Sequence, residues 1–104
     1  MPSPNQMPSP NPRVNGLVAR RVLIDGDVQG VFFRDTCRRI AVGSGVAGWV
    51  RNRADGRVEA WLEGASEPVD RLVEWCRQGP AGAQVNGVEV THEEPSGETG
   101  FRIR

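Results

Sequence analysis

Two short alternating runs separated by a turn signal constrain the fold of this chain most strongly. Residues 46–53 (VAGWVRNR) and 58–64 (VEAWLEG) alternate small or apolar side chains with larger or charged ones, which is the two-residue period of a half-buried strand. Asp55-Gly56 lies between the runs and favours a tight turn. The pattern therefore predicts a β-hairpin. Trp49 and Trp61 fall on its charged side, where we expect an exposed cross-strand aromatic pair.

Helical periodicity appears on both sides of this hairpin. The apolar stripe of the first segment comprises Phe33, Cys37, Ile40 and Ala41, and that of the second comprises Val69, Leu72, Val73 and Cys76. Gly43 and Gly45 are expected to end the first helix, and Ser66 is the expected N-cap of the second. Both cysteines fall on these stripes, so we expect them to be buried thiols.

Three further segments are typical of strands. Residues 17–25 (LVARRVLID) are rich in apolar and β-branched side chains, Val85, Val88 and Val90 mark another strand, and Phe101 and Ile103 a short final one. The order β-α-β-β-α-β plus a short C-terminal strand predicts an α+β fold. It is the ferredoxin-like split β-α-β sandwich, an antiparallel sheet with two helices on one face. Because this fold hosts many unrelated activities, it does not by itself name one.

The chain divides into a short tail and one domain. Residues 1–15 (MPSPNQMPSPNPRVN) contain a near-repeated hexamer without apolar periodicity, so we expect a disordered tail, with Met7 as an alternative start. Residues 16–104 form the single expected domain.

Composition excludes several classes of function. Thirteen basic and 13 acidic residues balance to a formal charge of zero, which argues against a nucleic-acid binder. The basic residues other than the single His are all Arg, so no lysine can form a Schiff base. No apolar run approaches the roughly 20 residues of a membrane span. Without a recognisable signal peptide or CxxC pattern, we expect a cytoplasmic protein with two free thiols.

The predicted topology brings two polar residues together. The first and second strands run in the same direction with the third between them, so their carboxyl ends share one edge of the sheet. The glycine-containing loop 26–33 and Asn52 both lie at that edge. Inward-turned amides of the loop, the N-terminus of the first helix and the guanidinium of Arg34 predict a phosphate cradle there.

Two stretches of the sequence resemble the signatures of a known family. GDVQGVFFR at 26–34 is similar to the acylphosphatase signature G-x-V-Q-G-V-x-F-R, and residues 48–59 resemble its second signature, G-x-V-x-N-x-x-D-G-x-V-E. The resemblance covers roughly residues 17–104. It implies hydrolysis of small-molecule acyl phosphates to a carboxylate and inorganic phosphate, without a metal or organic cofactor. A monomer is the default for such a domain.

The resemblance also implies roles for individual residues. Arg34 binds the phosphate, helped by loop amides, and Asn52 positions the attacking water. The backbone that forms the cradle is that of Gln29, Gly30, Val31, Phe32 and Phe33. Phosphoryl transfer depends mostly on positioning and charge stabilisation, so few catalytic groups are needed.

One departure and several alternatives accompany this hypothesis. Asp27 occupies a position that is usually basic in the family, and we expect its carboxylate to point away from the anion site. His92 is expected to be a surface residue. The main alternative is a non-catalytic phosphate-binding or anion-binding ferredoxin-like module. Two others are a single-stranded RNA binder and a carbamoyl-handling domain of larger maturation proteins.

Overall fold

The computed structural model describes residues 16–104; the predicted disordered tail, residues 1–15, lies outside the described residues. In this part of the chain the elements are β1 (Leu17–Asp27), α1 (Phe33–Ser44), β2 (Ala47–Asn52), β3 (Val58–Ala65), α2 (Ser66–Cys76), β4 (Gln84–Glu93) and β5 (Phe101–Ile103). The predicted order of helices and strands is confirmed. Neither helix is long and apolar enough to cross a membrane.

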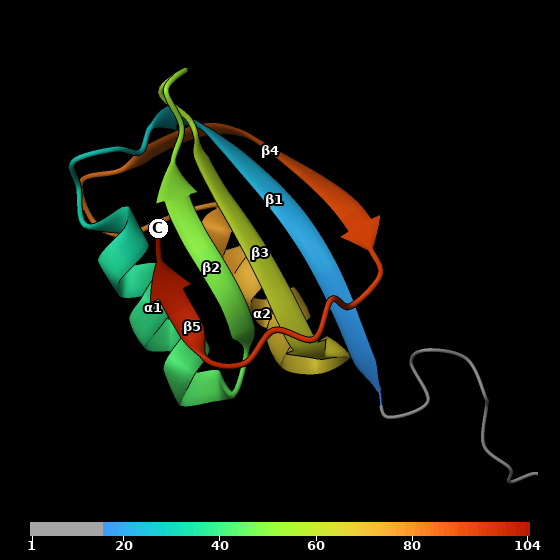
Figure 1. Ribbon diagram of the computed structural model, residues 1–104. Coiled ribbons are helices and arrows are strands. Elements are labelled where there is room, and N and C mark those ends of the chain that lie inside the picture. Colours follow the sequence, from blue (N-terminus) through green and yellow to red (C-terminus); the bar gives the residue numbers. More distant parts are fainter. Residues whose placement is uncertain (1–15) are drawn as a thin grey trace, which may run out of the picture.

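The strands form one sheet in the order β4-β1-β3-β2-β5 (Figure 1). β3 pairs antiparallel with both β1 and β2, so those two strands run in the same direction and end at one edge, as predicted. β4 is antiparallel to β1. β5 departs from the antiparallel pattern because it pairs in parallel with β2. β4 ends on the side of the sheet where β2 begins. The chain enters β5 from that same side, so β5 runs in the same direction as β2.

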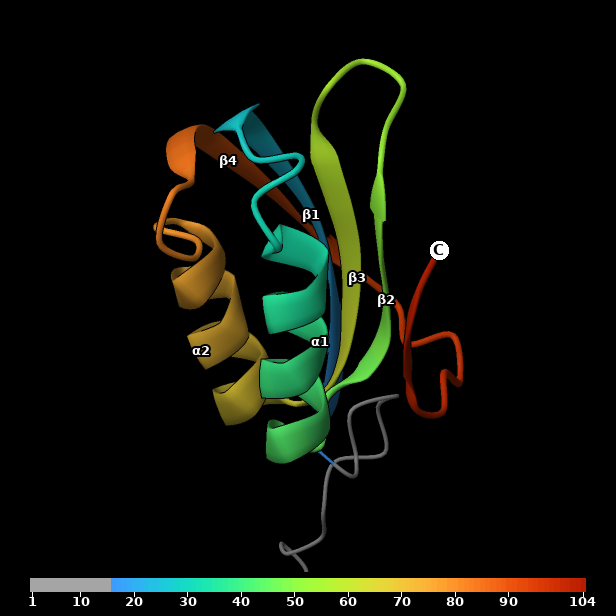
Figure 2. The ribbon, with the colours of Figure 1, turned by 90° about the vertical axis from the view of Figure 1, so that its left-hand side faces the viewer.

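The two helices cover one face of the sheet (Figure 2). The predicted alternation of the hairpin holds, since Val50, Val58, Ala60 and Leu62 all face the helices in the main core. The largest fully buried side chains include Phe33, Ile24, Leu62 and Leu72. Burial of each such side chain contributes roughly 1.5–3 kcal/mol, and this packing fixes α1 against the sheet edge where the loop and Asn52 meet.

The helix ends agree with the sequence only in part. Gly45 closes α1 with a φ of 74°, as predicted, but Gly43 lies inside the helix. The prediction for Ser66 is wrong: Ser66 is the first residue of α2, and Ala65 precedes it without a side-chain cap. β3 runs directly into α2, so the capping position falls on the last residue of the strand.

The expectation of an exposed aromatic patch is also wrong. Trp49 and Trp61 are cross-strand partners, but each is only 8% exposed, and they form a second small core with Ala19 on the helix-free face. The guanidinium carbon of Arg21 lies 5.3 Å from the ring centroid of Trp61, and that of Arg104 lies 4.4 Å from the ring of Trp49. These two arginines therefore cover the ring faces that alternation places toward solvent.

Residues 94–100, called here the crossing segment, span the helix-free face between β4 and β5 (Figures 1 and 2). The buried carboxylate of Glu63 accepts hydrogen bonds from the backbone N–H groups of Ser96, Gly97 and Glu98 at 2.9–3.1 Å, and from Trp61 Nε1 at 2.9 Å. Burial opposes ionisation of this carboxyl. The hydrogen bonds outweigh burial and hold its pKa below the usual range. Glu63 therefore fixes the path by which the chain reaches β5.

Candidate functional site

The loop between β1 and α1 depends on backbone conformations that its sequence permits. The register of β1 against β4 shifts between Asp25 and Gly26, and a Cβ at Gly26 would lie 2.1 Å from the backbone oxygen of Gln84. Only glycine fits this close approach. Gly30 has a φ of 78°, and Phe32 has a φ of 62° although it is not a glycine. These positive φ values turn the chain sharply into α1.

The N-terminus of α1 opens onto this loop. Phe32 is the N-cap residue and has no side-chain oxygen with which to cap the helix. The first N–H groups of the helix, which have no partner within it, therefore remain available to an external acceptor. Phe33 is buried in the main core and anchors this first turn, and both Phe33 and the next residue, Arg34, line one pocket.

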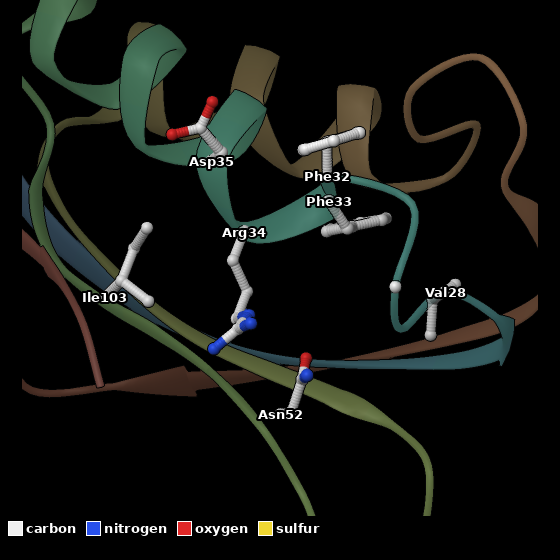
Figure 3. A pocket seen from close by; sticks show the side chains of 8 residues that line it. Val28, Phe32, Phe33, Arg34, Asp35, Asn52 and Ile103 are labelled. Atoms are coloured by element: carbon white, nitrogen blue, oxygen red, sulfur yellow. The ribbon is translucent and has the colours of Figure 1, made fainter.

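Asn52 reaches the same place from the sheet. It is the last residue of β2, and the alternation of that strand puts its side chain on the face covered by the helices. Figure 3 shows the side chains of Arg34 and Asn52 pointing toward one another from α1 and β2. Among the described residues, Asn52 Oδ1 is a buried side-chain oxygen with no hydrogen-bond partner. An unsatisfied buried acceptor is costly, so this oxygen is suited to bind a donor that enters the site.

A pocket of about 240 Å³ lies between these groups. Its lining residues are Val28, Gly30, Phe32, Phe33, Arg34, Asp35, Asn52 and Ile103 (Figure 3). Within residues 16–104, Arg34 makes no salt bridge or side-chain hydrogen bond. Most other arginines there are paired, for example Arg21 and Arg51 with Glu59 at 2.6 Å. Arg34 therefore presents to the pocket a guanidinium that has no ion-pair partner within residues 16–104.

The predicted site residues fall into two groups. Gly30, Phe32, Phe33, Arg34 and Asn52 line the pocket, whereas Gln29 and Val31 do not. Val31 is half-buried and packs against the main core.

The side chain of Gln29 turns toward the hairpin. Its Nε2 donates hydrogen bonds of 2.9 Å to the backbone oxygens of both Arg53 and Arg57. The family resemblance implies a role only for the backbone of Gln29, so this side-chain contact is a finding of the structure.

Three lining residues were not predicted. Val28 lies inside the first motif, and Asp35 follows Arg34 on α1, so their neighbourhood in sequence could have suggested both. Ile103 comes from β5, and nothing in its local sequence indicates that it reaches the pocket. Its place follows from the parallel pairing of β5 with β2.

The residues that were not expected to take part in the site occupy peripheral or structural positions. Asp27 is exposed and is not among the pocket-lining residues, and His92 is exposed on β4. Cys37 and Cys76 are buried free thiols. Contact with Cys37 and burial raise the pKa of the Cys76 thiol. In residues 16–104 no three His, Cys, Asp or Glu side chains gather in a way that could hold a metal ion.

Comparison with known proteins identifies relatives over most of the chain. The family model described as Acylphosphatase matches residues 20–103. An acylphosphatase of Rubrobacter xylanophilus is 56% identical over 85 residues, which cover 81% of this chain and 77% of the relative. The structure of an acylphosphatase from Coxiella burnetii superimposes with a TM-score of 0.83 at 33% identity, covering 86% of this chain and 95% of that one.

A larger protein contains a similar unit. The crystal structure of full-length HypF in the phosphate- and nucleotide-bound form matches with a TM-score of 0.79 at 26% identity. The match covers 85% of this chain but only 12% of HypF.

Proposed function

Since the chain belongs to the acylphosphatase family, we propose that Arg34 and the loop before α1 hold the phosphoryl group of its substrate while Asn52 positions the attacking water. Acylphosphatases hydrolyse small-molecule acyl phosphates, and this chain is such a hydrolase. The observation that carries the proposal is the unpartnered, buried Oδ1 of Asn52 facing the unpaired guanidinium of Arg34 across one pocket.

The phosphoryl group occupies the side of the pocket formed by the loop and α1. Its oxygens accept hydrogen bonds from backbone N–H groups of residues 29–33 and from the guanidinium of Arg34, which is planar and suited to two oxygens at once. The N-terminal end of the α1 dipole adds to the stabilisation of negative charge. Asp35 also lines the pocket, so the site combines a strong cation with one neighbouring carboxylate.

The attacking water lies on the side of Asn52. Oδ1 accepts one hydrogen from the water and directs its oxygen toward phosphorus, opposite the bond to the acyl group. The new bond forms between phosphorus and the water oxygen, while the bond between phosphorus and the bridging oxygen breaks. The carboxylate leaves with that electron pair and needs no proton from an acid. The proton of the water passes to solvent or to a phosphate oxygen, so positioning supplies most of the catalysis.

Hydrolysis of benzoyl phosphate by wild type, Asn52→Ala and Arg34→Ala tests these roles. Asn52→Ala is expected to lower kcat about 100-fold or more, the loss associated with misplacing a reacting group, with inhibition by inorganic phosphate nearly unchanged. Arg34→Ala is expected to impair both turnover and phosphate inhibition. Near-normal turnover of Asn52→Ala would refute the role of Asn52. Phosphate binding without turnover in wild type would instead indicate the non-catalytic anion-binding module.

We further propose that the protein acts as a cytoplasmic monomer. Both cysteines are free, buried thiols although they contact one another, which is in keeping with a reducing compartment. Light scattering after size-exclusion chromatography tests the monomer, and fractionation of the source cells tests the compartment.

A further inference from the structure

The Gln29 side chain connects two parts of the site that the sheet does not connect directly. Its Nε2 donates to the backbone oxygens of Arg53 and Arg57, both at 2.9 Å, across 24 and 28 positions of sequence. We propose that Gln29 is a positioning residue that sets the phosphate-binding loop against Asn52. The inference rests on the proposed function, because it assigns the phosphate to one side of this contact and the water to the other.

The two sides belong to separate parts of the fold. The proposed phosphate ligands all lie in residues 29–34, between the end of β1 and the first turn of α1. Asn52 lies at the end of β2, and β3 separates β2 from β1 in the sheet. β1 also bends away at its bulge and pairs with Gln84 of β4 at its end. Within residues 16–104, the two Gln29 bonds are the hydrogen bonds that join residues 28–34 to the β2–β3 hairpin.

The two acceptors belong to Arg53 and Arg57, which flank the hairpin turn next to Asn52 and form what we call the hairpin neck. Arg53 N donates to Arg57 O at 2.8 Å, and Gly56 N donates to Arg53 O at 3.2 Å. The amide of Gln29 adds a second donor to each of these carbonyls, so both of its hydrogens are used. The Arg53 oxygen belongs to the peptide group between Arg53 and Ala54, one residue beyond Asn52. Holding it in place restricts the backbone next to the residue that carries the Asn52 side chain.

A glutamine side chain suits this contact in both length and charge. A neutral primary amide offers two hydrogens in one plane at the required reach. Asparagine is one methylene shorter, and an ionised glutamate would place a carboxylate against two carbonyl oxygens. Every proposed phosphate ligand lies on the loop. If the loop shifts relative to the hairpin, these ligands therefore keep their positions relative to one another, and phosphate affinity changes little. The same shift moves the water held by Asn52 out of line with phosphorus, so kcat falls more than phosphate affinity.

The test is a double-mutant cycle with benzoyl phosphate as substrate and inorganic phosphate as inhibitor. The variants are Gln29→Met, Asn52→Ala and the combination, with Gln78→Met as control because Gln78 is exposed after α2 and outside the pocket. We expect Gln29→Met to lower kcat about 10- to 100-fold while the inhibition constant of phosphate changes less than about twofold. In the Asn52→Ala background, Gln29→Met should lower kcat less than about threefold, since no positioned water remains to be displaced.

Each outcome decides the inference. If Asn52→Ala loses turnover but Gln29→Met retains the kcat of wild type, the positioning role of Gln29 is refuted and the proposed function stands. Equal fold-losses in both backgrounds, or parallel losses of kcat and phosphate affinity, also refute it, because Gln29 would then act independently of Asn52. If Asn52→Ala retains wild-type turnover, the proposed function fails and the inference fails with it. Circular dichroism and the Gln78→Met control separate these results from a loss of folding.

A second variant gives an independent readout. In Gln29→Glu the ionised carboxylate repels both carbonyls, whereas the protonated acid can donate to one of them. We expect its kcat relative to wild type to rise as the pH falls from 7 toward 5. A constant ratio across this range would refute the role of Gln29 as a hydrogen-bond donor.

Discussion

Replacement of Glu63 by glutamine is the sharpest test of how the helix-free face is held together. Glu63 is 4% exposed, and neutral donors surround its carboxylate: Oε1 accepts from Trp61 Nε1 and Ser96 N, and Oε2 accepts from Gly97 N and Glu98 N. The three consecutive backbone N–H groups form an anion nest around the carboxylate. Glu63→Gln keeps the shape of the side chain but replaces one of its two acceptor oxygens with an NH₂ group, which only donates.

The expected loss follows from the number of bonds affected. Whichever way the amide turns, its NH₂ faces two N–H donors, so two charge-assisted hydrogen bonds are lost. At about 1.5–3 kcal/mol each, the free energy of unfolding falls by roughly 3–6 kcal/mol. The total for a domain of this size is about 5–15 kcal/mol, and the corresponding fall in Tm exceeds about 10 °C.

Urea denaturation followed by tryptophan fluorescence measures this loss, because Trp61 donates to the carboxylate and Trp49 packs with Trp61 in the second small core. Glu94→Gln is the matched control, since Glu94 is exposed at the start of the crossing segment, and it should change the free energy of unfolding by less than about 0.5 kcal/mol. If Glu63→Gln lowers the free energy of unfolding by less than about 1 kcal/mol, the nest does not stabilise the fold as argued.

Three further predictions concern stability and chemistry elsewhere in the domain. Gly43→Ala should raise the free energy of unfolding by about 0.5–1 kcal/mol in urea titrations, because Gly43 is inside α1 and open space surrounds its added Cβ; a lower value would contradict this. Burial opposes ionisation of Glu59 and Glu63, but hydrogen bonds outweigh it and lower both pKa values. Their stabilisation is thus complete above the ordinary carboxyl range and lost as the pH falls through the lowered values; unchanged stability at pH 2 would count against it. Cys37 and Cys76 should resist a thiol reagent until the protein unfolds, and rapid reaction of the native protein would disprove their burial.

The local elements of the fold were predictable because their signals lie among near neighbours. Alternation in residues 58–64 identified which side of β3 meets the helices, and the spacing of Val69, Leu72, Val73 and Cys76 identified the buried side of α2. The cap of α2 was not predictable in the same way. Ser66 has the right chemistry for an N-cap, but the direct junction of β3 with α2 moves that position to Ala65.

The site was predictable as far as strand direction alone determines it. Placing the ends of β1 and β2 at one edge brings Arg34 and Asn52 together, whatever the details of packing. The side-chain partners of Gln29 were not predictable, because they are two backbone oxygens 24 and 28 positions away. A carbonyl group carries no mark in the sequence, since every residue has one.

The sequence by itself determined the order of elements, the inward sides of the strands and helices, and the two motifs that meet at the pocket. Periodicity, turn-forming dipeptides and glycines encode these features within a few residues. Only the tertiary structure decided the burial of Trp49 and Trp61, the contribution of Ile103 and the bridge made by Gln29. Each of these depends on a segment brought from a distant part of the chain. Arg104 lies over Trp49, Arg21 lies over Trp61, β5 lies beside β2, and the hairpin neck lies beside the loop. No local pattern specifies such a meeting, because it results from the packing of the whole sheet.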